Sequence, residues 1–211
     1  MAQKDILFLD PGHAFGIENR TNQFMLENFT IVDQYNFADM DLTPFKCIVV
    51  HDFIDQEYMY RNRKKLEAFL NERNIVIWGG HLVKEWLPGC PLFTPKQINK
   101  HSDYEISVVN EHPIFVGVAT EEMTYNKGVA GFFARGSHTP VPEGAEVLLT
   151  LPDGAHITYI DRNTTNGTIL AHAGRDLFAQ RMQNKTTDRI SSQLLAWIHD
   201  EAKALKDGAQ L

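Results

Sequence analysis

The sequence predicts a three-layer α/β fold, in which a mostly parallel sheet carries helices on both faces and antiparallel hairpins in its C-terminal half. Up to residue 80, short and continuously apolar runs alternate with helical patterns, which is typical of right-handed crossovers between buried parallel strands. Beyond residue 100, the strand-like runs are joined by turns rich in Pro, Gly and Asn, which favour antiparallel pairing. A chain of 211 residues with 43% hydrophobic content can bury one sizeable core, so we expect one domain over 1–211.

The first half of the chain supplies the expected parallel strands, which are the apolar runs at 5–10, 29–35, 45–53 and 74–78. Residues 19–28 have a modest helical pattern. The best amphipathic helix spans 55–73, where the charges lie largely opposite an apolar side made of Met59, Leu66, Phe69 and Leu70.

The second half supplies further strand-like runs, at 103–109, 128–135, 145–151, 155–161 and 167–173. Two turn sequences, LPDGAH and RNTTNGT, are typical of hairpin connections. A final helix is expected near 187–206, with Thr187 or Asp188 as its N-cap and Gly208 as its stop. Its predicted buried stripe consists of Ile190, Leu194, Trp197, Ile198 and Leu205.

Charge and hydropathy exclude several classes of partner. The net charge of -7 argues against nucleic acid, because binding the phosphate backbone needs a clustered basic surface. The one basic cluster, RNRKK at 61–65, falls in a predicted helix and is interpreted as a solvated face. No apolar run approaches the roughly 18 residues that span a membrane, and no signal peptide is recognisable, so a cytoplasmic location is expected. Self-association through an edge strand stays open.

The run NIVIWGGHLV raises the main functional question. In several α/β enzymes, a tight turn at the end of such a strand presents a Cys or Ser nucleophile, and here His81 stands in that position. Neither cysteine replaces it, because Cys47 begins an apolar strand and Cys90 lies in a Pro/Gly loop. The sequence therefore predicts a ligand site at this turn without a thiolate nucleophile.

The order of these pieces resembles the ThuA-like (trehalose-utilisation) branch of the class I glutamine amidotransferase-like superfamily. The similarity covers about residues 5–178 and is carried by FKCIVVHD, the long helix, NIVIWGGHLV, HPIFVGV and the segment VLLTLPDGAHITYIDRNTTNGTILAHAGRDLF. The resemblance implies a flavodoxin-like, class I glutamine amidotransferase-like sandwich and a sugar-like ligand, without specifying a reaction. Amidotransfer by the family's cysteine mechanism is excluded by His81. Relatives often close their last strand with Gly-His, whereas here Arg175 follows Gly174.

Ligands of open α/β sheets bind beyond the carboxyl ends of the strands, which places seven candidate residues on one rim. They are Asp10, His13, His51, Asp52, Gly79, Gly80 and His81. Gly79 and Gly80 would let a substrate approach the backbone. A helix beginning at His81 would add free N–H groups suited to an anion or an oxygen-rich molecule.

Two kinds of chemistry are compatible with this rim. Asp10, His13 and His81 could hold zinc or a similar divalent metal, although no local spacing signature supports this. Without a metal, Asp52 or Glu85 could orient His81 for acid–base catalysis, with Glu85 one helical turn further on. The structural alternative is that a His-Glu pair at this spacing only supports a surface helix.

Besides Gly79 and Gly80, four residues are candidate substrate contacts. His51 and His172 end strands, and Arg135 and His138 lie in a Gly/Pro-rich loop that is alternatively a plain solvent loop.

Two functional hypotheses remain. The first is a hydrolase or isomerase acting on a small oxygen-rich, sugar-like molecule, and the second is a non-catalytic ligand-binding or association module. They differ in whether Asp10, His13, Asp52 and His81 point into one cavity.

Overall fold

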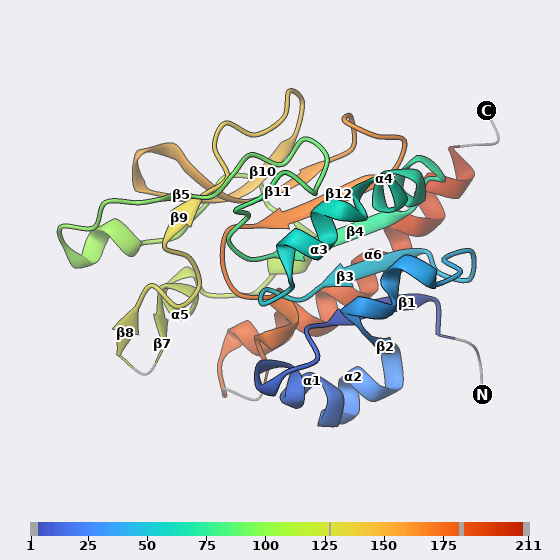
Figure 1. The fold of residues 1–211 in the computed structure, drawn as a ribbon. Helices are drawn as coiled ribbons and strands as arrows, with labels where there is room; N and C mark the ends of the chain where they lie inside the picture. The colour runs from blue at the N-terminus through green and yellow to red at the C-terminus, as the bar shows by residue number, and fades with distance from the viewer. Residues whose placement is uncertain (1–3, 127, 182–183, 209–211) are drawn as a thin grey trace.

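The computed structural model describes residues 4–126, 128–181 and 184–208 and centres on a sheet of eight strands. The strand order is β2-β1-β3-β4-β12-β11-β10-β6 (Figure 1). The parallel part consists of β2 (Thr30–Asp33), β1 (Ile6–Asp10), β3 (Cys47–Val50), β4 (Ile75–Gly79) and β12 (Thr168–His172). The antiparallel part consists of β11 (Ala155–Asp161), β10 (Glu146–Leu151) and β6 (Ser107–Val108). The outermost residues of the expected domain, 1–3 and 209–211, lie outside the described residues.

Helices cover both faces of the sheet, as the three-layer prediction requires (Figure 1). One face packs against α3 (Gln56–Arg61) and α4 (Arg63–Asn71), and the other packs against α2 (Gln23–Asn28) and α6 (Arg189–Asp207). Two short helices, α1 (Ile17–Thr21) and α5 (Thr120–Thr124), complete the helical elements.

Alternate residues of each strand enter different cores. Phe8, Val49 and Ile77 join the core beneath α6, whereas Leu9 and Val50 join the core beneath α4. Because successive side chains of a strand point to opposite faces, a strand covered on both sides must be apolar throughout. This explains why β1, β3, β4 and β12 are fully buried and read as continuous apolar runs.

The expected helix over 55–73 is wrong in one respect, because it is divided between α3 and α4 at Asn62. The backbone of Asn62 leaves the helical region with φ -100° and ψ 9°, and its side-chain amide donates to the Tyr58 carbonyl. A side chain that bonds the backbone locally competes with helix propagation. The predicted apolar side is nevertheless confirmed, since Met59, Leu66, Phe69 and Leu70 are all buried.

Two of the predicted strands are much shorter than expected. Only Ser107–Val108 of 103–109 pairs with the sheet, and only Val129–Ala130 of 128–135 is a strand, β8. β8 pairs with β7 (Tyr125–Asn126) in a separate ribbon. The following chain turns at Gly131, whose φ of +85° is disfavoured for other residues, so that Phe133 is buried in a loop. A second ribbon joins β5 (Thr94–Pro95) to β9 (Gly136–Ser137).

The remaining C-terminal predictions are confirmed. LPDGAH joins β10 to its antiparallel neighbour β11, and RNTTNGT joins β11 to antiparallel β12. The final helix begins after Asp188 and ends at Gly208, with Ile190, Leu194, Trp197 and Ile198 buried and Leu205 partly buried against them. Within the described residues, no helix combines the length and the apolar character needed to cross a membrane.

Gly167→Ala tests the close approach between β12 and the end of α4. A Cβ atom on Gly167 would lie 2.5 Å from the Leu70 carbonyl oxygen, and closer still to that of Asn74. Because backbone oxygens cannot move aside easily, we expect the free energy of unfolding to fall by about 1–3 kcal/mol in urea denaturation. Gly208→Ala is the matched control, with its Cβ 3.4 Å from the nearest oxygen and an expected change below about 0.5 kcal/mol. Equal losses in both variants would contradict this packing.

Candidate functional site

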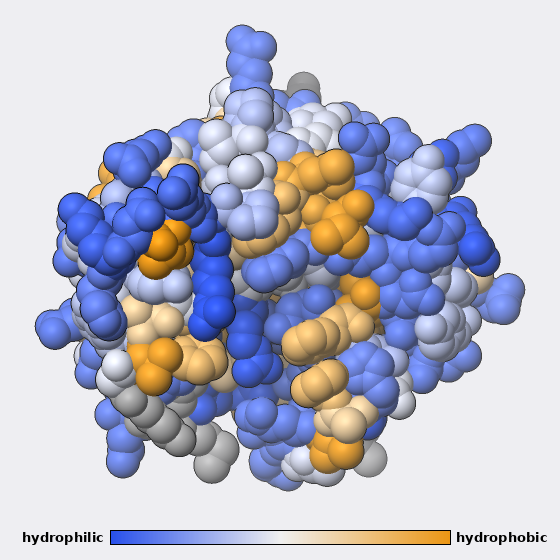
Figure 2. Space-filling model, turned by 60° about the vertical axis from the view of Figure 1, so that its left-hand side comes forward, coloured by the Kyte–Doolittle hydropathy of each residue, from blue (hydrophilic) through white to orange (hydrophobic). Residues whose placement is uncertain are grey.

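The candidate site lies at the carboxyl edge of the sheet, next to the point where the strand order reverses. β1 pairs with β2 on one side and with β3 on the other. The chain therefore adds β2 to one side of β1, and β3 and then β4 to the opposite side. In open α/β sheets the crevice beyond the carboxyl ends at such a point is the usual ligand site. Figure 2 turns this side of the molecule forward and shows apolar patches separated by a hollowed polar stretch.

A cavity of about 410 Å³ opens at this edge of the sheet. Its lining comes from the chain segments that follow β3, β4 and β12, and consists of Asp52, Phe53, Ile54, Gln56, Gly80, His81, Gly174 and Arg175. Of the residues that the sequence placed on the rim, Asp52, Gly80 and His81 meet here. The cavity therefore joins three strand ends that are distant in sequence.

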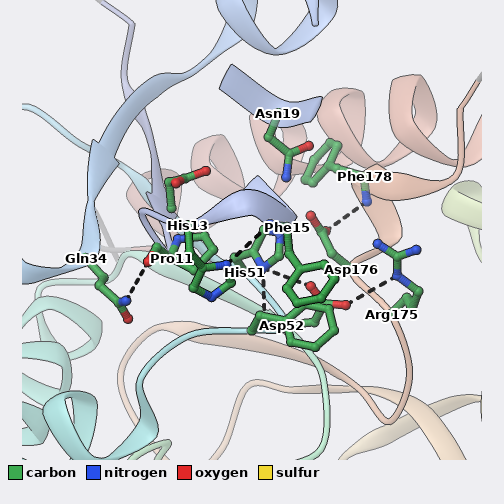
Figure 3. Close-up of polar contacts among 12 residues, drawn as sticks. Pro11, His13, Phe15, Asn19, Gln34, His51, Asp52, Arg175, Asp176 and Phe178 are labelled. Carbon is green, nitrogen blue, oxygen red and sulfur yellow. Dashed lines mark hydrogen bonds and ion pairs between the residues drawn. The ribbon is translucent and has the colours of Figure 1, made fainter. Parts of the chain in front are cut away.

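Asp52 forms the acidic wall of the cavity and is held from two sides (Figure 3). His51 Nδ1 lies 2.9 Å from Asp52 Oδ1, and Arg175 Nε lies 3.4 Å from Asp52 Oδ2. The same His51 nitrogen lies 3.0 Å from the backbone N–H of Phe53. A protonated Nδ1 donates to Asp52, whereas an unprotonated one accepts from Phe53, so the partner of His51 depends on its protonation.

Carboxylates surround the buried His51 and set its charge. Burial opposes the imidazolium, but Asp52, Asp176 and Asp10 outweigh burial and raise the pKa of His51. Burial by itself would raise the pKa of Asp52, yet His51 and Arg175 hold that pKa below the usual range. Burial raises the pKa of Asp176 to about 6, with His51 acting in the opposite direction. The cluster thus combines an ionised Asp52 with an Asp176 that keeps its proton up to a pH of about 6.

Asp10 and His13 do not reach the cavity lining. Asp10 is buried, accepts from the Gly12 N–H at 2.8 Å and forms an ion pair with Arg20. His13 is exposed and caps a short 3-10 turn by accepting from the Phe15 N–H at 3.3 Å.

The predicted metal set of Asp10, His13 and His81 is therefore not assembled. Among residues 4–126, 128–181 and 184–208, no three His, Cys, Asp or Glu side chains gather in a way that could hold a metal ion. The reason is local, because Asp10 is committed to Arg20 and His13 to its own turn.

The expectation of a helix beginning at His81 is wrong. Residues 81–93 form an irregular loop, because Pro88 disfavours helical geometry just before it and the Gln56 side chain takes over the backbone groups. Gln56 donates to the His81 carbonyl at 2.8 Å and accepts from the Val83 N–H at 2.8 Å. The segment that begins at His81 therefore offers no helix N-terminus to the cavity, and Glu85 is an exposed loop residue, not one helical turn from His81 as predicted.

His81 nevertheless presents its ring to the cavity. The imidazole stacks on Phe93 with 3.7 Å between ring centroids and 13° between planes. Partial burial lowers the pKa of His81, Arg135 acts in the same direction, and Asp52 opposes them. Within the described residues, neither ring nitrogen is used in a hydrogen bond. His81 is thus a neutral, positioned imidazole that is free to exchange a proton with a ligand.

The two glycines before His81 lie where a side chain would not fit. Gly80 has φ +151°, which other residues rarely adopt, and a Cβ atom there would lie 2.5 Å from Trp78 Cη2. Its backbone N–H donates to the His172 carbonyl at 2.9 Å, which ties the turn to β12. Gly79 packs against the backbone of Asp176, since a Cβ atom would lie 2.9 Å from Asp176 Cα.

Besides His51, which contacts Asp52 from outside the lining, three predicted substrate contacts lie outside the cavity. His172 is fully buried between Thr158 Oγ1 at 2.7 Å and the Phe133 carbonyl at 3.2 Å, and burial lowers its pKa to about 3. His138 is also fully buried, facing the carbonyls of Pro91 and Gly80. These two histidines hold loops together.

Arg135, the third of these contacts, is exposed and donates from Nε to the Gly131 carbonyl at 2.8 Å. It closes a turn and does not line the cavity.

The sequence analysis missed Phe53, Gln56 and Arg175 as lining residues. Phe53 directly follows the predicted His51-Asp52 pair, and Arg175 directly follows a Gly after the last parallel strand, so both could have been found by extending each strand end. Gln56 gave no signal, because its role depends on a loop that was expected to be helical.

Both cysteines are unsuited to nucleophilic chemistry. Burial raises the pKa of Cys47 well above its ordinary value and raises that of Cys90 to about 12. Since the thiolate is the nucleophile, neither side chain supports cysteine catalysis.

No protein-family model matches the chain, and no curated protein is significantly similar to it.

Asp176→Asn is expected to raise the free energy of unfolding relative to wild type near pH 7 but not near pH 4. A carboxyl with a folded pKa of about 6 binds its proton more tightly than in the unfolded chain, where the value is 3.8. The stabilising contribution of this proton is complete below about pH 4 and is lost as the pH rises through about 6. The loss in the free energy of unfolding amounts to up to about 3 kcal/mol.

Urea unfolding of both proteins between about pH 4 and about pH 7 measures this difference. Asn keeps the acceptor for the Phe178 N–H, which donates to Asp176 Oδ1 at 2.9 Å. Asp200→Asn, on the exposed side of α6, controls for the loss of a surface carboxylate. A wild-type-to-Asp176→Asn difference that stays constant across this range would contradict the buried protonated carboxyl.

Proposed function

We propose that the cavity beyond β3, β4 and β12 binds a small, oxygen-rich molecule. The observation that carries this proposal is the convergence of Asp52, His81 and Arg175 on one cavity of about 410 Å³ at the carboxyl ends of three neighbouring strands. Concave sites with a few convergent polar groups on an apolar wall are typical of small-molecule sites. Here Phe53 and Ile54 supply the apolar wall.

The polar groups offer complementary contacts to hydroxyl and carbonyl oxygens. The ionised Asp52 accepts from a ligand hydroxyl, while Arg175 donates to an oxygen and His81 does either. The backbone at Gly80 and Gly174 allows close approach, since both lack a side chain at the cavity wall. The resemblance to the ThuA-like branch supports a sugar derivative within this class.

Acid–base catalysis by His81 is the second candidate function. It is favoured by the neutral imidazole, which is stacked on Phe93 and has a lowered pKa. In a hydrolysis or isomerisation, His81 would take a proton from water or from a ligand carbon or hydroxyl, and Asp52 would stabilise the imidazolium.

The opposing hypothesis is a non-catalytic binding module. Of the residues predicted to converge, Asp52 and His81 line the cavity, whereas Asp10 and His13 do not. The lining also contains no Ser, Thr or Cys among the described residues. Binding is therefore the better-supported function, and catalysis requires its own test.

Ligand binding is tested by the histidine side-chain NMR signals of the protein during titration with neutral sugars, polyols and sugar acids. A cavity ligand is expected to shift the ring signals of His81 and to leave those of His101 unchanged, because His101 is exposed in a 3-10 helix and does not line the cavity. His81→Gln identifies the His81 signals. If every compound leaves His81 unshifted at millimolar concentration, the proposal fails.

Catalysis is tested by following any bound compound over time by NMR, with wild type beside His81→Gln and the control His101→Gln. An acid–base role predicts a loss of turnover of about 100-fold or more in His81→Gln, while the dissociation constant changes little. The wild-type rate should rise with pH through the lowered pKa of His81, since the neutral imidazole is the base. Bound compounds that remain unchanged in wild type identify a binding module.

A further inference from the structure

Arg175 is the least expected member of the cavity lining. Its side chain is 52% exposed, and its Nε faces Asp52 Oδ2 at 3.4 Å. Within the described residues, the two terminal nitrogens of the guanidinium have no hydrogen-bond partner. A guanidinium presents its donors in a planar fork, which matches the paired oxygens of a carboxylate or a phosphate.

One contact, to Asp52, orients this guanidinium from behind. Asp52 is only 8% exposed, and His51 holds its other oxygen, so the carboxylate has little freedom to move. Figure 3 shows His51, Asp52 and Arg175 in one chain of polar contacts. A donor that is held in place before binding loses less conformational entropy when a ligand arrives. Asp52 is thus a positioning residue for Arg175.

The charged groups that line the cavity leave one cation available to a ligand. Among the described residues of the lining, Arg175 is the one permanent cation and Asp52 the one carboxylate, and Asp52 is also paired with His51. Asp10 is neutralised by Arg20, and the buried Asp176, with a pKa of about 6, does not line the cavity. His81 is neutral, while the exposed Arg135 acts on it as a positive neighbour. Arg175 is therefore open to an anion, although the chain as a whole carries -7.

We propose that the ligand of this cavity carries an oxyanion, either a carboxylate or a phosphate, and that Arg175 binds it through its terminal nitrogens. This inference rests on the proposed function, since it names the class of molecule that the cavity takes. The rest of the ligand lies against Phe53 and within reach of His81. Arg135 is not the anchor, because its Nε is committed to the Gly131 carbonyl and it does not line the cavity.

The test compares ligands that share one skeleton and differ in charge. Glucose, gluconate and glucose 6-phosphate are titrated by calorimetry into wild type, Arg175→Gln, Arg175→Lys and Arg135→Gln, with Arg63→Gln on α4 as the remote control. We expect wild type to prefer at least one of the two anions over glucose. The affinity of Arg175→Gln for the preferred anion should be at least about tenfold lower than that of wild type, and its affinity for glucose should change less than about threefold. Arg175→Lys should retain part of it, because it keeps the charge but not the fork.

The outcomes separate this inference from the proposed function. Glucose that binds and shifts His81, without any preference for gluconate or glucose 6-phosphate, overturns the anion inference and leaves the binding site standing. An anion preference that survives Arg175→Gln but is lost in Arg135→Gln also overturns it, because the anchor is then Arg135. If none of the three compounds binds wild type, both proposals fail for this ligand class. Preference for gluconate or for glucose 6-phosphate identifies which oxyanion the site takes, and the melting temperature of each variant verifies that it is folded.

Discussion

The burial of charge at the ends of β1, β3 and β12 is the constraint on which the rest of the site depends. Ionised groups removed from water are costly unless they are paired, and here Asp10, Asp52 and His51 are all nearly inaccessible. Asp10 is paired with Arg20 from α1, and Asp52 with His51 and Arg175. Each pairing requires a neighbouring loop to come close. The positions of α1 and of the loop after β12 are thus tied to the charges they neutralise.

The order of the sheet explains why these groups meet at all. β3 lies between β1 and β4, and β4 lies beside β12, so segments far apart in the chain end side by side. The loops after β4 and β12 then pack so closely that only glycine fits at position 79, against the backbone of Asp176. Parallel pairing by itself therefore brings the carboxyl ends together, and small residues let the loops approach. A cavity at this edge follows from the topology, whereas its chemistry follows from which residues succeed each strand.

The predictability of the structure from sequence varies with the physical origin of each feature. Strands that are buried on both faces give continuous apolar runs, so β1, β3, β4 and β12 and the long helix α6 were correctly predicted. The loop after His81 was not, because the side chain of Gln56 replaces helical hydrogen bonds, a tertiary effect that no local pattern contains. For the same reason the sequence identified the rim and three of the lining residues but not the others. His172 ends a strand as His51 does, yet it is enclosed by Thr158 and Phe133.

Electrostatic range decides whether an anion can bind to a protein with a net charge of -7. Exposed charges act over a Debye length of about 8 Å at physiological ionic strength, so most carboxylates on the surface are screened from the cavity. Arg175 is inside that distance from any ligand in the cavity and lies beside low-dielectric apolar walls, where its attraction is stronger than in bulk water. The overall charge therefore slows the encounter with an anion more than it weakens the bound complex. Local arrangement, not net charge, determines the preference of this site.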